Sequence, residues 1–201
     1  MTTTSQKKTA NKTKATAVKV VDKPIKELPV NPFAFEVLQL VSSQRSNAKK
    51  IEVLQKYRDP SLVTLFVWNF DESIISVLPP GEVPYASVGE QNSFSGTMSE
   101  KIEDAVVKMG ELGSNSLGSQ DQGKSSIRKE YQKFYNFVKG GNDGLSSLRR
   151  ETMFINILQG LHPLEAEIVC LVKDKKLGEK YKITKQIVSE AYPDISWGGR
   201  S

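Results

Sequence analysis

The sequence contains very little of the chemistry from which thiol and metal sites are built. Its 201 residues include one cysteine, Cys170, and one histidine, His162. An internal disulfide is therefore excluded, and neither a paired-histidine site nor a cysteine-based zinc site is expected. The longest apolar run, residues 62–70, is far shorter than the roughly 20 residues of a membrane-spanning helix. We expect a cytoplasmic protein that uses no metal or other cofactor and has no membrane partner.

Charge is distributed unevenly along the chain. The formal net charge is +5, from 28 basic and 23 acidic side chains. Residues 1–30 contain seven lysines against Asp22 and Glu27, which leaves 21 basic and 21 acidic side chains in residues 31–201. Residues 1–30 also lack an apolar period, so we predict a disordered basic tail. Its lysines are expected to bind nucleic-acid phosphates, or alternatively only to keep the chain soluble, the phosphate-binding candidates being Lys7, Lys8, Lys12, Lys14 and Lys19.

Residues 31–196 are predicted to form one all-α domain, a compact bundle of about six or seven short helices with long irregular loops. Apolar residues recur at helical spacing in residues 33–41, 48–57, 126–139, 147–159, 163–173 and 184–191. Glycine and proline predict irregular loops at about 78–96 and 110–126, and residues 197–201 are expected to be a C-terminal tail.

Two helix starts are marked by capping residues. Asp59 followed by Pro60 predicts a helix over residues 60–70, because aspartate accepts from free N–H groups and proline fits the first helical position. A strand is the alternative there, since the run is rich in β-branched and aromatic residues. Thr97 and Glu100 have the spacing of a capping box ahead of a helix that ends near residue 112.

The pattern of a phosphate-binding loop occurs once, with its defining residues at Gly118, Gly123, Lys124 and Ser125. Such a loop follows a buried parallel strand, whereas residues 113–117 are polar apart from one leucine. The acidic pair that could bind magnesium, Asp71 and Glu72, precedes the loop, which reverses the usual order. We interpret the stretch as a flexible linker and do not expect an enzyme.

His162 and Cys170 are too far apart for a catalytic dyad. If Pro163 begins a helix, His162 lies at its cap and Cys170 lies about 12 Å further along the axis. Cys170 is predicted to be a small core residue, and His162 a capping or surface group. Glu165 and Glu167 point to different sides of the same helix and make a poor acid and base pair.

Basic and aromatic residues alternate in residues 127–139, as they do in proteins that bind single-stranded nucleic acid. The simpler interpretation is an amphipathic helix whose aromatic face is buried. The cations that could contact phosphates here and just beyond the following turn are Arg128, Lys129, Lys133, Arg149 and Arg150. Their clustering on one face of the structure would favour nucleic-acid binding.

Several segments in order make residues 33–195 resemble a family of small uncharacterised proteins from large contractile-tailed bacteriophages, including cyanophages. The resemblance rests on residues 69–71, 78–85, 137–141, 150–163, 165–167, 173–175, 183–185 and 190–194. The family implies a phage gene product, but it implies no reaction. The glycine-rich stretch around Lys124 and the basic tail lie outside these segments.

We therefore expect a non-enzymatic phage accessory protein in the host cytoplasm that binds nucleic acid, or a phage or host protein complex acting on nucleic acid. The alternative is a protein–protein adaptor, an assembly factor or a minor virion component. In that case the proline-stiffened loop would dock on the partner through Pro79, Pro80, Pro84 and Tyr85. An exposed apolar patch larger than a few hundred Å² beside the Pro79 loop would favour the adaptor.

Overall fold

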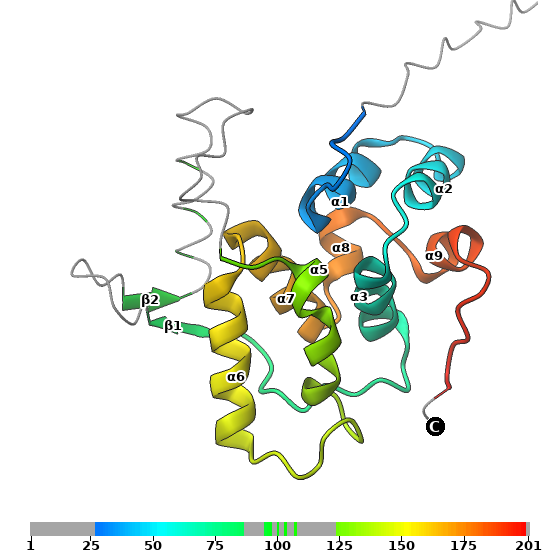
Figure 1. The fold of residues 1–201 in the computed structure, drawn as a ribbon. Helices are drawn as coiled ribbons and strands as arrows, with labels where there is room; N and C mark the ends of the chain where they lie inside the picture. Colours follow the sequence, from blue (N-terminus) through cyan, green and yellow to red (C-terminus); the bar gives the residue numbers. More distant parts are fainter. Residues whose placement is uncertain are drawn as a thin grey trace, which may run out of the picture.

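The computed structural model describes residues 27–86, 95–97, 100, 103, 107 and 124–199 (Figure 1). Residues 1–26 of the predicted disordered tail therefore lie outside the described residues. The same is true of most of the predicted loop at 110–126. The end of the tail segment contacts the helical body. The Leu28 N–H donates to the Tyr57 hydroxyl at 2.9 Å, and Glu27 pairs with Lys56 at 3.1 Å.

Three helices open the body: α1 (Ala34–Ser43), α2 (Asn47–Lys56) and α3 (Pro60–Phe70). The Asp59 carboxylate accepts from the Ser61 N–H at 2.9 Å, which confirms the predicted helix start. The helix prediction for residues 60–70 is also confirmed. Its apolar residues Leu62, Leu65 and Phe66 are all buried, because α3 packs against both α7 and the segment after residue 126.

The predicted irregular loop at 78–96 contains one short regular element. Strand β1 (Pro84–Ala86) pairs antiparallel with β2 (Ser95–Thr97), with Tyr85 opposite Gly96. The pairing of β1 with β2 requires two separate segments to meet, which composition alone does not predict. The predicted capping box is confirmed, since the Thr97 N–H donates to Glu100 at 2.8 Å and the Glu100 N–H donates to the Thr97 hydroxyl at 3.4 Å.

The predicted single α-helix over residues 126–139 is wrong in detail. One α-helical turn, α5 (Ile127–Glu130), continues as a 3₁₀ helix, η1 (Tyr131–Phe137). A 3₁₀ helix has three residues per turn, so side chains three apart lie above one another. Phe134 and Phe137 are three apart and both are buried, which fits this tighter helix.

The C-terminal half contains α6 (Ser147–Gly160), α7 (Pro163–Lys173), α8 (Leu177–Tyr181) and α9 (Lys185–Ala191). The sequence did not predict α8. The first backbone N–H of this short helix donates to the Asn69 side chain of α3 at 3.1 Å. The helix ends at Lys182, whose φ of +53° is left-handed.

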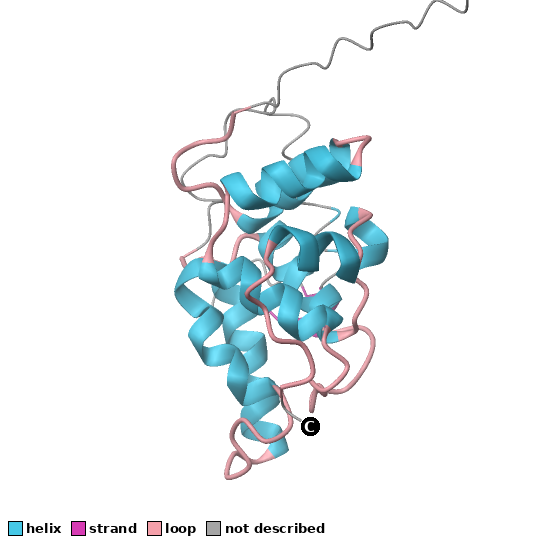
Figure 2. Ribbon diagram, turned by 90° about the vertical axis from the view of Figure 1, so that its right-hand side faces the viewer, coloured by secondary structure: helices cyan, strands magenta, loops and turns pink. Residues whose placement is uncertain are grey.

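Helix α7 lies at the centre of the molecule and packs against α1, α3, α6 and α8 (Figure 1). Its apolar face, with Ile168, Val169 and Val172, is completely buried. Helices dominate the described residues, with loops at the periphery (Figure 2), so the all-α class is confirmed. None of the helices described in the structure has the length and apolar character to span a membrane.

Candidate partner-binding groove

Helices η1 and α6 run side by side (Figure 1). Residues of both helices line a groove. Its volume is about 700 Å³. Arg150 of α6 fixes the two helices relative to each other, because it donates to the carbonyl oxygens of Asn136 in η1 and Asn142 in the turn between them, both at 2.8 Å. The groove is lined by Ser125, Glu130, Lys133, Asn136, Leu148, Arg149, Thr152, Met153, Asn156, Ile157 and Gly160.

Apolar side chains from α6 form the floor and one end of the groove. Ile157 is 7% exposed, Met153 is half-buried, and Leu148 is 74% exposed. Leu148, Thr152, Asn156 and Gly160 follow one another at four-residue intervals, so they form one ridge along the helix. A mostly exposed leucine that lines a groove is typical of a surface that buries further area when a partner binds.

Two of the charged side chains that line the groove are paired with described residues, and the third is not. The Glu130 carboxylate accepts from the Ser125 hydroxyl and from the Lys133 ammonium, both at 2.6 Å. Although desolvation opposes it, these two hydrogen bonds hold the pKa of Glu130 below its ordinary value. The Arg149 guanidinium, which also lines the groove, makes no hydrogen bond or ion pair with any residue that the structure describes.

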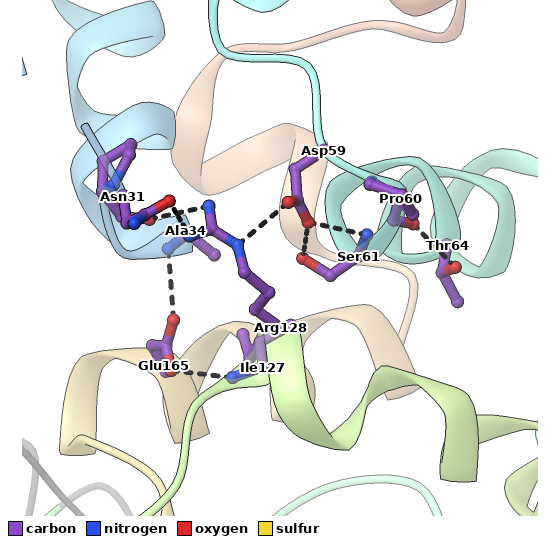
Figure 3. A network of polar contacts seen from close by, with 10 residues as sticks. Asn31, Ala34, Asp59, Pro60, Ser61, Thr64, Ile127, Arg128 and Glu165 are labelled. Carbon is purple, nitrogen blue, oxygen red and sulfur yellow. Dashed lines mark hydrogen bonds and ion pairs between the residues drawn. The ribbon is translucent and has the colours of Figure 1, made fainter.

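A separate polar network joins α1, α5 and α7 around Glu165 (Figure 3). This carboxylate is 1% exposed and accepts from the backbone N–H groups of Ala34 at 3.1 Å and Ile127 at 2.9 Å. It therefore caps the first turns of two helices that lie 93 residues apart in the chain. Desolvation raises the pKa of Glu165, against the opposing effect of the two backbone hydrogen bonds.

Arg128, one of the predicted nucleic-acid contacts, belongs to this network (Figure 3). Its Nε donates to Asp59 at 2.9 Å, and its two terminal nitrogens donate to the Asn31 side chain and the Pro32 carbonyl at 3.2 and 3.3 Å. The guanidinium thus connects α5 to the starts of α1 and α3. Together with the exposed Lys129, it lines a smaller cavity of about 310 Å³, away from the η1–α6 groove.

The proline loop is fastened to the end of α7. Lys173 has a buried ammonium that donates to the carbonyl oxygens of Pro79 and Gly81 at 2.8 and 3.1 Å and to Asp174 at 2.6 Å. Pro79 and Pro80 are exposed, whereas Pro84 and Tyr85 lie in β1. The predicted docking loop is therefore fixed at its beginning, by contacts that hold its backbone and leave both prolines outside.

The five predicted cations of the body do not form one patch. Lys133 and Arg149 lie in the groove, Arg128 and Lys129 line the other cavity, and Arg150 holds the backbone of the turn between η1 and α6. The five predicted tail lysines, Lys7, Lys8, Lys12, Lys14 and Lys19, lie outside the described residues. Of the aromatic residues in the segment, Phe134 and Phe137 are buried against Trp68, while Tyr135 is exposed.

Most of the phosphate-loop pattern, including Gly118 and Gly123, lies outside the described residues. Ser125, whose hydroxyl would hold magnesium in such a loop, donates that hydroxyl to Glu130, and its backbone N–H donates to the Gly160 carbonyl at 2.8 Å. In the part of the chain that the structure describes, the one sheet is the antiparallel β1–β2 pair.

His162 has the capping position that the sequence predicts, whereas Cys170, predicted to be a core residue, is partly buried and packs against the core. His162 is the N-cap of α7, where its Nδ1 accepts from the Leu164 N–H at 3.1 Å, and its ring stacks on Phe35 at 4.9 Å between ring centres. Burial raises the pKa of the Cys170 thiol to about 12, which leaves the unreactive thiol form at neutral pH. Across the described residues, no three histidine, cysteine or acidic side chains lie together as a metal site would require.

Sequence reasoning missed the apolar part of the groove and the capping role of Glu165. A signal for the groove exists, because Leu148 lies off the buried stripe of α6 that contains Phe154, Ile157 and Leu158. An apolar residue on the polar side of an amphipathic helix indicates a contact outside the core. Nothing local identifies Glu165, because both of its partners lie more than 35 residues away.

Comparison with known proteins gives one match. No curated protein and no solved structure matches the chain. A family model described as "Family of unknown function (DUF6433)" matches residues 37–109 and 113–179, which span α1 to α8 and include both helices of the groove. This match covers more than half of the sequence, and the chain therefore belongs to the DUF6433 family of unknown function.

Proposed function

We propose that this protein is a non-enzymatic adaptor that binds another protein in the η1–α6 groove. The observation that carries the proposal is the combination of an open groove of about 700 Å³ with Leu148 three-quarters exposed at its end. Covering the apolar side chains of the groove would stabilise a complex by about 25 cal/mol for each Å² removed from water. Among the described residues of the groove, Leu148 is left mostly exposed to solvent.

The hydrogen bonds and ion pairs that the basic side chains of the helices already make also favour a protein over nucleic acid as the partner of the helices. Binding to a duplex or single strand needs several unpaired cations along one path. Arg128 and Arg150 instead donate to Asp59 and to backbone carbonyl oxygens, and Lys133 pairs with Glu130. Two cations in an apolar groove fit a protein segment better than a phosphate backbone.

Site-specific photo-crosslinking tests this proposal. A benzophenone amino acid at position 148 is expected to capture a defined partner in cells that naturally make the protein, and the same group at Ile75 serves as the control. Ile75 is also exposed but does not line the groove. The purified partner should then bind the wild-type chain and lose binding to Leu148→Asp. Equal capture at both positions, or equal binding by the variant, would contradict the proposal.

A second candidate function is binding to nucleic acid through the N-terminal lysines. The observation behind it is seven lysines in residues 1–30, against a charge-balanced remainder. Such binding would be independent of base sequence and would weaken steeply with salt. The resemblance to contractile-tailed phage proteins supports an accessory role in the cytoplasm of an infected bacterium, with virion association as the alternative.

This second function is tested in the full-length chain by changing Lys7, Lys8, Lys12, Lys14 and Lys19 to glutamine. Binding to labelled DNA and RNA at low salt should fall to background if the tail supplies the affinity. The pair Lys133→Gln and Arg149→Gln is the control and should bind as the wild type does. Loss of binding in the control alone would place the nucleic-acid site in the groove.

A further inference from the structure

We infer that the η1–α6 groove takes an amphipathic helix that carries carboxylate side chains, an inference that rests on the proposed adaptor function. The groove's shape argues for a helix. Leu148, Thr152, Asn156 and Gly160 form a ridge at four-residue spacing, against which the ridges of a third helix can pack. Thr152 and Asn156 are exposed beyond Leu148, whereas Gly160 contacts Ser125, so the open part of the ridge runs from Leu148 to Asn156. The ridge is about 18 Å long, the length of three helical turns.

An extended segment fits the groove poorly. Its backbone N–H and C=O groups would need partners once they were covered. The walls of the groove are helices whose own backbone groups are paired within the chain, and the Thr152 hydroxyl already donates to the Leu148 carbonyl. A helix satisfies its backbone internally, so it brings only side chains to this surface.

The charges of the groove define the polar face of the occupant. Glu130 is already paired with Lys133 and Ser125, whereas Arg149 has no side-chain partner in the described part of the chain. The three charged groups sum to one positive charge. A carboxylate on the occupant can therefore pair with Arg149 and share Lys133, and a bidentate contact to the guanidinium is geometrically favoured.

The same charges argue against two other occupants. A second copy of this chain, docked groove to groove, would bring together two sites that each carry a net charge of one positive unit, which is unfavourable compared with an acidic partner. The chain's own N-terminal lysines are excluded for the same reason. An acidic, amphipathic helix of another protein is the occupant whose charge and apolar face both match.

Selection from a displayed peptide library tests this inference with the full-length protein. The library encodes 14-residue helical peptides with randomised faces, and selection runs in parallel on wild type, Leu148→Asp and Arg149→Glu. We expect wild type to enrich peptides with apolar residues at positions i, i+3, i+4 and i+7 and with Asp or Glu on the adjacent face. Those peptides should bind Arg149→Glu about fivefold more weakly and lose binding to Leu148→Asp.

The possible outcomes distinguish failure of the acidic-helix inference from failure of the proposed adaptor function. Peptides that need Leu148 but carry no acidic preference would overturn the acidic helix and leave the adaptor function standing. Absence of any peptide that distinguishes wild type from Leu148→Asp would overturn both. A labelled single-stranded oligonucleotide is included as a competitor, and its binding in the groove, abolished in Arg149→Glu, would replace the helix by nucleic acid.

Discussion

The Glu165 network and the η1–α6 groove lie on either side of the same segment, α5 and η1, and use charge in different ways. In the network, Glu165 is buried and Arg128 donates through three nitrogens to groups of the chain itself. In the groove, Arg149 is exposed and lacks a partner among the described residues, next to the exposed Leu148. The first arrangement joins helices to one another, and the second leaves polar and apolar groups exposed.

The comparison shows why a basic segment cannot be assigned to binding from its composition. Arg128 and Lys133 lie five residues apart, with the same charge and both with exposed side chains. Arg128 holds the starts of α1 and α3, whereas Lys133 borders a groove. Substitutions in the network should therefore lower stability, and substitutions in the groove should lower binding. The following predictions separate these two effects.

Glu165→Ala should give the largest loss of stability. It leaves the Ala34 and Ile127 N–H groups buried without an acceptor and creates a small cavity, at a cost of about 4 kcal/mol in the free energy of unfolding. Urea unfolding followed by circular dichroism measures the change. Glu165→Gln is the matched control and should lose about half as much, because its amide oxygen can still accept one bond. An unchanged midpoint in the alanine variant would contradict the capping role.

Asp71→Asn should destabilise the chain by about 2 kcal/mol at neutral pH. Although desolvation opposes it, hydrogen bonds from Ser73 and Gly198 hold the pKa of Asp71 below its ordinary value of 3.8. A lowered folded pKa contributes stability above pH 3.8 that is lost as the pH falls through the folded value. The difference between wild type and variant should therefore shrink in acid. A pH series of urea unfolding curves tests this, and a pH-independent difference would refute it.

Arg128→Ala should lower the free energy of unfolding by about 1 kcal/mol, because its ion pair with Asp59 is partly screened by solvent. Thermal unfolding should show the shift, and Lys129→Ala, an exposed neighbour, should show almost none. Partner binding in the groove should be unaffected by both changes at temperatures where the chain is folded. A variant that loses partner binding while keeping its stability would place Arg128 in the binding surface.

Leu148→Asp should have the smallest effect on stability, about 0.5 kcal/mol or less, because the side chain is mostly exposed. The same substitution should abolish partner binding in the groove. Measuring both properties on the same preparation distinguishes a binding residue from a core residue. A large fall in the unfolding midpoint would show that Leu148 supports the fold and would remove the main argument for the groove.

Helix starts are the part of the fold that can be predicted well from the sequence. Asp59, His162 and Thr184 each accept a hydrogen bond from a backbone N–H two or three residues ahead. Such contacts are local, so the residue type and its spacing are sufficient to identify them. The switch from α5 to η1 could not be predicted in the same way, because it depends on Phe134 and Phe137 packing against Trp68 of another helix.

The sequence by itself determined the all-α class, the capping position of His162 and the division into a basic segment and a charge-balanced body. The tertiary structure decided which charges are internal and which are available. It also decided that α8 forms and that Glu165 caps two helices. The physical reason is the range of the interactions: local caps act over two or three residues, whereas the partners of Asn69 and Glu165 lie 38 to 131 residues away in the chain.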